Sequence, residues 1–126
     1  MEKKILVVDD EQDTQWFLSK VLTEEGFDVQ TASTGAEALE MVPNYKPNLA
    51  ILDLRLPDMH GIEVLKIIKE RKWKTKVIIL TAYGTPEIEA EAKELGVCAF
   101  MSKPYILEDL IKSVKNALEE DILEHP

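Results

Sequence analysis

Three acidic residues follow two short apolar runs, and their side chains are of a type that binds cations or attacks phosphorus. Asp9 and Asp10 come directly after the run Ile5–Val8. Asp53 comes directly after the run Leu49–Leu52. Carboxylates held close together repel one another, so a fold that gathers them needs a compensating cation. Oxygen ligands of this kind suit a hard octahedral ion, magnesium or, as a substitute, manganese.

Two further polar residues stand at the ends of later apolar runs. Thr81 follows the run Val77–Leu80, and Lys103 comes two positions after the run Ala99–Met101. The Lys103 ammonium is a mobile positive charge that suits a phosphoryl oxygen. The Thr81 hydroxyl can contact a second such oxygen. Together these residues predict a site that receives a phosphoryl group.

The charges of these side chains support this interpretation. Asp9, Asp10 and Asp53 would bring three negative charges, which one magnesium ion and Lys103 would cancel. An aspartyl phosphate on Asp53 would add about one negative charge, spread over three oxygens. Phosphoryl transfer depends mainly on positioning and electrostatic stabilisation, and a carboxylate such as Asp53 is a suitable nucleophile.

The apolar runs alternate with segments whose apolar residues recur at helical spacing. This alternation predicts an α/β fold: a doubly wound, five-stranded parallel sheet of order 2-1-3-4-5 with helices on both faces. Thr34 and Thr85 are expected N-caps, and Gly26 and Gly96 are expected helix stops. The expected strands are 5–8, 29–32, 49–54, 77–80 and 99–101, and the helical stripes lie within 17–22, 38–42, 64–68, 88–95 and 107–118.

This strand order determines where the polar residues should meet. In open α/β sheets the functional site lies beyond the carboxyl ends of the strands, where the strand order reverses. The first and third strands are neighbours in the expected order, so Asp9, Asp10 and Asp53 should converge near the centre of that edge. Thr81 and Lys103 should border them on one side.

Length and charge limit the classes of protein that fit. A chain of 126 residues predicts one domain, residues 1–120, with a frayed acidic tail at 121–126. Fifteen basic and 24 acidic residues give a net charge of −9, which opposes nonspecific binding to nucleic acid or anionic lipid. No apolar run approaches the ~20 residues of a membrane span, and no signal peptide precedes the first strand. We therefore expect a cytoplasmic protein without direct contact to nucleic acid or membrane.

Sulfur and histidine content exclude a structural zinc site. Cys98 is the single cysteine, so it forms no internal disulfide, and His60 and His125 are the two histidines. Cys98 is expected to be a small core residue. The basic run 71–76 favours a solvated loop around a packed Trp73.

Four fragments in this order resemble a response-regulator receiver domain over essentially the whole chain. They are Val7–Glu11, Leu52–Pro57 with Gly61, Thr81–Gly84 and Lys103–Tyr105. The resemblance implies the flavodoxin-like version of the α/β fold and a role in two-component signalling. It implies that Asp53 accepts a phosphoryl group from a phosphohistidine in a magnesium-dependent reaction.

The same resemblance assigns roles to the residues around Asp53. It implies that Asp9, Asp10 and Asp53 hold magnesium together with the backbone carbonyl of Arg55. Thr81, Lys103 and the backbone of Ala82 would bind the phosphoryl group.

The resemblance also implies a switch, a fixed turn and a means of tuning the phosphoryl lifetime. Thr81 would reorient toward the phosphoryl group while the ring of Phe100 turns inward, and the bond before Pro104 would be cis. Arg55 and Tyr83 occupy positions that tune hydrolysis of the acyl phosphate. Because both are large, we expect slow autodephosphorylation. The chain would catalyse its own phosphorylation rather than act as a conventional turnover enzyme.

The expected partners follow from this role. A sensor histidine kinase or a histidine phosphotransferase would donate the phosphoryl group, and a downstream protein or output domain would respond. We expect a monomer that dimerises, if at all, on phosphorylation. Residues 80–84 and 93–96 resemble the single-domain intermediate of the sporulation phosphorelay. The alternative is the receiver portion of a longer transcriptional regulator.

Trp16 lies opposite the apolar stripe of the first helix and should face solvent near the site. Because aromatic residues are enriched at interface centres, we hypothesise that Trp16 contacts the helix of the donor that carries the histidine. Two features depart from the family pattern. His60 stands where Asp or Asn is usual before Gly61, and the segment 105–107 lacks an acidic N-cap.

Three other functions share parts of the pattern. A flavodoxin-like electron carrier needs a phosphate-binding first loop, and the acids 9–11 would repel that phosphate. A phosphatase with an aspartyl nucleophile needs a second Asp two residues beyond Asp53, where Arg55 stands. Nucleotide enzymes are disfavoured because the chain has no Gly-rich phosphate loop.

Overall fold

The computed structural model describes residues 2–123 and the side chains of residues 2–119. Five parallel strands form one sheet of order β2-β1-β3-β4-β5, which confirms the predicted topology. The strands are β1 (Lys4–Val8), β2 (Asp28–Ala32), β3 (Leu49–Leu52), β4 (Lys76–Thr81) and β5 (Ala99–Ser102). The helices are α1 (Gln12–Glu24), α2 (Gly35–Tyr45), α3 (Gly61–Glu70), α4 (Pro86–Glu94) and α5 (Leu107–Leu123).

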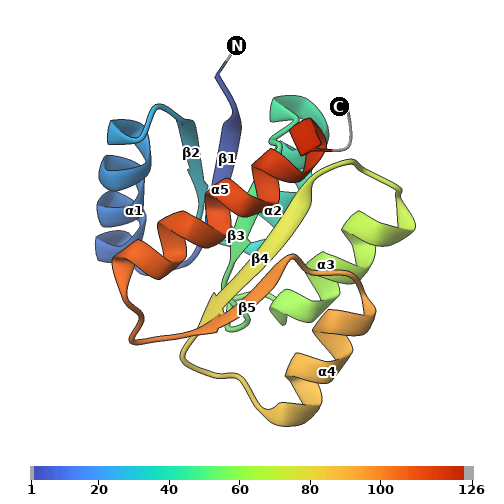
Figure 1. Ribbon diagram of the computed structural model, residues 1–126. Helices are drawn as coiled ribbons and strands as arrows, with labels where there is room; N and C mark the ends of the chain where they lie inside the picture. Colours follow the sequence, from blue (N-terminus) through green and yellow to red (C-terminus); the bar gives the residue numbers. More distant parts are fainter. Residues whose placement is uncertain (1, 124–126) are drawn as a thin grey trace.

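Helices cover both faces of the sheet, which is why the strand sequences are almost continuously apolar. Neighbouring residues of a strand point to opposite faces. Ile5 and Val7 belong to the core layer that α1 and α5 cover, and Leu6 and Val8 belong to the layer that α2, α3 and α4 cover. Figure 1 shows α5 crossing the sheet on the side that also carries α1. The two core layers hold the strands in register, and this brings their carboxyl ends to one edge.

The helix ends follow the predicted caps. The Thr34 hydroxyl accepts a hydrogen bond from the Glu37 N–H at 3.0 Å, and the Thr85 hydroxyl accepts one from the Ile88 N–H at 3.2 Å. Gly26 lies at φ 97° after α1, in the left-handed region that glycine adopts at low cost. None of the helices described over residues 2–123 has the length and apolar character of a membrane span.

Two expectations about element limits need adjustment. The third strand ends at Leu52 rather than at residue 54, so Asp53 stands just outside the sheet ladder. Helix α5 continues to Leu123, three residues past the expected domain limit at residue 120. Of the expected tail at 121–126, residues 124–126 lie outside the described residues.

Candidate functional site

Asp9 and Asp53 lie side by side at the carboxyl ends of β1 and β3. The two strands are paired up to Val8 and Leu52, and the Asp53 N–H donates to the Val8 carbonyl at 2.9 Å. Each aspartate is only 3% exposed. The sheet ladder therefore fixes the backbone of both residues and holds two carboxylates in a buried position.

Every oxygen of the Asp53 carboxylate has a donor. Oδ1 accepts from the Thr81 hydroxyl at 2.7 Å and from the Arg55 N–H at 3.3 Å. Oδ2 lies 3.3 Å from the Lys103 ammonium. Thr81 and Lys103 come from the ends of β4 and β5, so the strand order places both near Asp53 at the same edge of the sheet. The predicted gathering of these three residues is observed.

Lys103 is shared between the two buried carboxylates. Its Nζ atom lies 2.8 Å from Asp9 Oδ2, closer than to Asp53, and 3.8 Å from Glu11 Oε1. Burial lowers the pKa of Lys103, but the hydrogen bond and charge of Asp9, followed by those of Asp53, outweigh it and leave the pKa above the ordinary 10.5. For Asp9 burial dominates over the ammonium, so its pKa is raised above 3.8. Lys103 is therefore protonated throughout the physiological range.

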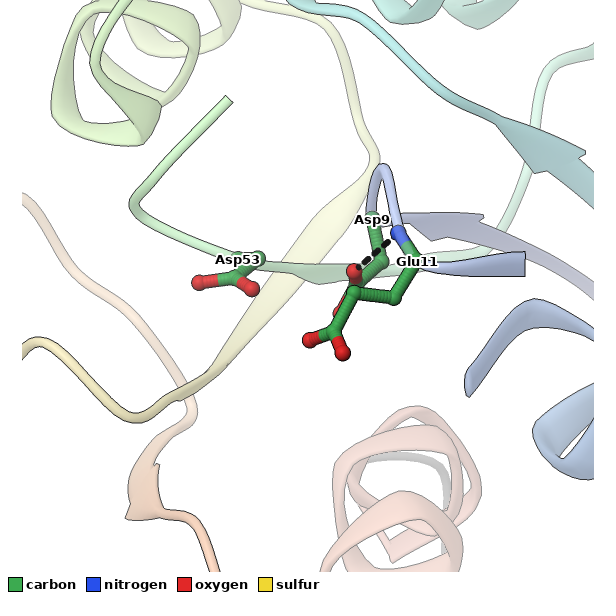
Figure 2. Close-up of side chains that lie close together, drawn as sticks. All are labelled: Asp9, Glu11 and Asp53. Carbon is green, nitrogen blue, oxygen red and sulfur yellow. Dashed lines mark hydrogen bonds between the residues drawn. The ribbon is translucent and has the colours of Figure 1, made fainter. Parts of the chain in front are cut away.

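A group of three carboxylates could hold a cation at this edge. Asp9, Glu11 and Asp53 each offer an oxygen, and these oxygens all lie within 4.8 Å of one another. Figure 2 shows the Glu11 side chain beside Asp9, and the Glu11 N–H donates to Asp9 Oδ1 at 2.9 Å. The sequence predicted Asp10, rather than Glu11, as the metal-binding neighbour of Asp9. The close group contains Glu11 because the turn after β1 brings this residue back over Asp9.

Asp10 nevertheless faces the same site. It is exposed and, together with Glu11 and Asp53, lines an open cavity of about 380 Å³. Arg55 and Tyr83 line this cavity as well, and the Arg55 guanidinium lies 4.7 Å from the centre of the Tyr83 ring. The cavity gives solvent and ligands a route to Asp53 between the acidic residues and this stacked pair.

The comparisons with known proteins agree with this geometry. The family described as the response regulator receiver domain matches residues 5–115. The chain belongs to this family. This receiver domain is 38% identical over 118 residues to "Sporulation initiation phosphotransferase F" of Bacillus subtilis. The aligned segment covers 94% of this chain and 95% of that protein.

Two other matches show how widely the receiver domain is used. The transcriptional regulatory protein PhoP of Bacillus subtilis is 38% identical over 126 residues, but this chain spans only 52% of its length. A solved structure titled as a CheY-like response regulator receiver domain protein from Methanospirillum hungatei superimposes with a TM-score of 0.93 at 33% identity. The superposition covers 98% of this chain and 99% of the Methanospirillum hungatei chain. The chain is thus a receiver of two-component signalling, similar both to a single-domain protein and to part of longer regulators.

The predicted switch residues lie on adjoining strands of the receiver. The Thr81 hydroxyl also accepts from the Tyr83 N–H at 3.1 Å, while the exposed Ala82 lies between them. The ring of the half-buried Phe100 lies over Gly84, because a Cβ placed on Gly84 would be 2.8 Å from Phe100 Cε1. Gly84 belongs to the quoted Thr81–Gly84 fragment, but its contact with Phe100 was not predicted.

The turn between β3 and α3 forms despite the substitution at His60. Nδ1 of His60 accepts from the Ile62 N–H at 3.1 Å and so caps α3, as Asp or Asn would. Gly61 approaches Asp53 closely, since a Cβ at this position would overlap the Asp53 carbonyl oxygen. The predicted cis bond between Lys103 and Pro104 is present as well.

The first helix is attached directly to the site. Gln15 Nε2 donates to the Asp9 carbonyl at 2.5 Å and to the Ser33 hydroxyl at 2.9 Å, a role for which the sequence gives no signal. On the same helix the Trp16 side chain is exposed by 65%, as predicted, with the Lys20 ammonium 5.2 Å from its ring centre. Cys98, by contrast, is exposed rather than a core residue.

Proposed function

We propose that Asp53 accepts a phosphoryl group from a phosphohistidine of a partner protein and that the receiver then switches or relays to a second partner. The observation that carries this proposal is the position of the Asp53 carboxylate. It is buried, paired with both the Thr81 hydroxyl and the Lys103 ammonium, and open to solvent through an acidic cavity. Membership of the receiver family supports the same assignment.

In the proposed step one Asp53 oxygen forms a bond to phosphorus. The bond from phosphorus to the donor's histidine nitrogen breaks, and its electron pair leaves with the imidazole. After the transfer, Lys103 and Thr81 contact oxygens of the phosphoryl group in place of the carboxylate oxygens that they contact in the unphosphorylated protein. The Ala82 N–H is proposed as a further donor.

The acidic side chains fit a divalent cation. Four carboxylates at this edge offer oxygen ligands, from Asp9, Asp10, Glu11 and Asp53, and they outnumber the two cationic side chains, Lys103 and Arg55. We assign magnesium or manganese to Asp9, Asp10, Asp53 and the Arg55 carbonyl, with Glu11 as an additional candidate. When bound, the ion neutralises carboxylates and stabilises charge on the transferring phosphoryl group.

The assignment is tested by mass spectrometry after incubation with acetyl phosphate and magnesium. The wild type should gain one phosphoryl mass, and Asp53→Asn should gain none. Asp13→Asn, on the exposed start of α1, is the matched control and should gain the same mass as the wild type. Phosphorylation of Asp53→Asn at the wild-type level would refute the assignment. Chelation of magnesium should abolish the gain in both the wild type and Asp13→Asn.

The donor is assigned as a sensor histidine kinase or a histidine phosphotransferase, and exposed Trp16 as part of its docking surface. Trp16→Ala should slow phosphotransfer from the cognate donor while leaving phosphorylation by acetyl phosphate unchanged. An unchanged rate from the protein donor would remove Trp16 from this surface. Because phosphohistidine donors draw on ATP, we place the exchange in the cytoplasm.

Two outputs are distinguished by a second measurement. The likeness to sporulation initiation phosphotransferase F supports a relay to another protein histidine, and the likeness to PhoP supports a receiver portion of a longer regulator. A relay predicts that phosphoryl leaves Asp53 when a histidine phosphotransferase is added. A regulator predicts no such transfer and instead a phosphorylation-dependent dimer, measurable by sedimentation.

A further inference from the structure

A second cavity, of about 530 Å³, lies at the end of the sheet opposite Asp53. The end of α2 and the loop that leads into β3 line one side of it, and the loop between α3 and β4 lines the other. These loops enter the amino ends of β3 and β4, whereas Asp53 and Thr81 stand at their carboxyl ends. The proposed phosphotransfer chemistry uses no residue of this cavity.

The walls of this cavity combine apolar side chains with polar and cationic ones. Pro43, Pro47 and the half-buried Trp73 contribute apolar surface, and Trp73 packs against the core. The buried Thr75 hydroxyl donates to the Pro47 carbonyl at 2.8 Å and so joins the two loops. The volume lies within the roughly 300–1,000 Å³ of small-molecule sites, which are mostly preformed and apolar with a few polar groups.

The charged groups at the rim are all cationic. Lys46, Lys72 and Lys74 line the cavity and are exposed, and no lining residue is acidic, although the chain carries a net charge of −9. Among the side chains described for residues 2–119, none lies in an ion pair with these three ammonium groups. The site therefore presents unpaired positive charge beside an aromatic ring, on a molecule that is otherwise acidic.

The backbone adds an independent observation. Lys46 at φ 54° and Lys72 at φ 58° are the non-glycine residues with left-handed backbone in the described part of the chain. Glycine or asparagine adopts this conformation at lower cost. Lys46 and Lys72 come directly after the last turns of α2 and α3, where a cation complements the helix dipole. Lys74 lies farther along the loop, so the helix dipole does not explain why all three lysines gather at this cavity.

We propose that this cavity binds a small organic anion: a carboxylate, sulfonate or phosphate carried on a flat apolar ring system. The ring would lie against Trp73 and the two prolines, and the anionic group among Lys46, Lys72 and Lys74. This site is separate from Asp53 and does not depend on the proposed phosphotransfer.

The test uses 1-anilinonaphthalene-8-sulfonate as the probe, in a Trp16→Phe background so that Trp73 is the reporting tryptophan. Dye emission should rise and Trp73 emission should fall along the same saturable curve. The triple variant K46Q/K72Q/K74Q should weaken dye binding about tenfold, since each exposed charge pair contributes modestly. The triple variant K20Q/K93Q/K112Q, with the same change in net charge on other surfaces, should stay within about twofold of the wild type. Asp53→Asn should bind as the wild type does.

Three results would overturn the proposal. The first is equal dye affinity in both triple variants, which would show that the rim lysines do not contribute. The second is equally tight binding of the uncharged N-phenyl-1-naphthylamine, which would make the cavity an apolar site without anion preference. The third is displacement of the dye by a glutamate-rich peptide at lower concentration than by 1-naphthoate or adenosine monophosphate, which would make this face a docking surface for an acidic protein segment.

Discussion

Replacement of Lys103 by methionine should destabilise the folded protein because two buried carboxylates lose their shared counter-charge. The ammonium lies 2.8 Å from Asp9 and 3.3 Å from Asp53, and its side chain is only 17% exposed. At an effective dielectric constant of about 20, the attraction to Asp9 is about 6 kcal/mol and that to Asp53 about 5 kcal/mol, before the cost of desolvation. Measured losses on breaking buried pairs by removing one partner are about 3–5 kcal/mol. Because Asp53 lines an open cavity, we expect a loss at the lower end of this range, about 3 kcal/mol.

The assay is urea unfolding at neutral pH in the presence of a chelator. Magnesium should restore much of the lost stability of Lys103→Met, because a divalent cation at the acidic group replaces the missing charge. The double variant with Asp9→Asn should also recover stability, since one of the two uncompensated carboxylates is gone. Lys93→Met is the control. This exposed lysine pairs with Glu89 at 2.8 Å across one helical turn, and its loss should change stability by less than about 0.5 kcal/mol.

A Lys103→Met protein as stable as the wild type without magnesium would refute this reasoning. It would mean that solvent in the cavity, rather than the ammonium, compensates the acidic group. A large loss that neither magnesium nor Asp9→Asn reduces would refute it as well, because the loss would then come from packing of the lysine stem.

Three further predictions follow from individual contacts. Gly84→Ala places a methyl group against the Phe100 ring and should lower the free energy of unfolding by about 1–3 kcal/mol. In the double variant, Phe100→Leu should largely relieve this loss. If thermal unfolding shows that the losses of the two single variants simply add, the contact is contradicted. Arg55→Ala or Tyr83→Ala should speed hydrolysis of the aspartyl phosphate up to about tenfold, because either change opens the wall of the cavity beside Asp53. The control Glu87→Ala, on α4, should leave the rate of hydrolysis unchanged. Equal hydrolysis rates in all three variants would show that the stacked pair is not a barrier to water. Asp58 accepts hydrogen bonds from the Ala36 and Gly35 N–H groups, and these bonds hold the pKa of Asp58 below 3.8. The stability that Asp58 contributes is therefore present above pH 3.8 and is lost as the pH falls through the lower pKa of the folded state. Asp58→Ala should therefore lower the urea midpoint at neutral pH, and the difference from the wild type should disappear in acid; a difference that is independent of pH would contradict the assignment.

The amino-acid sequence determined the fold and the identity of the central residues. Short, nearly continuous apolar runs, typical of strands buried on both faces, alternate with segments whose apolar residues recur at helical spacing. This pattern leaves few topologies for a chain of this size. Once β1 and β3 are neighbours, Asp9 and Asp53 must meet, because both directly follow paired strands. Thr81 and Lys103 then border Asp53 for the same reason.

Only the tertiary structure decided how the side chains pair within the site. The direction of a side chain after a strand depends on the dihedral angles of the loop, and no periodic pattern records these angles. The sequence therefore did not show that Glu11, rather than Asp10, joins Asp9 and Asp53 in the close acidic group. The contact between Gly84 and Phe100 likewise depends on how two loops approach across the edge of the sheet.

The basic run around Trp73 illustrates the same limit. In the sequence it is a short cationic loop, and a solvated loop is its simplest interpretation. The fold sets it opposite Pro43, Pro47 and Lys46, about thirty positions earlier in the chain, and the two segments enclose a cavity. Local sequence fixes which residues a loop contains, but the right-handed crossovers on the two faces of the sheet decide which loops become neighbours.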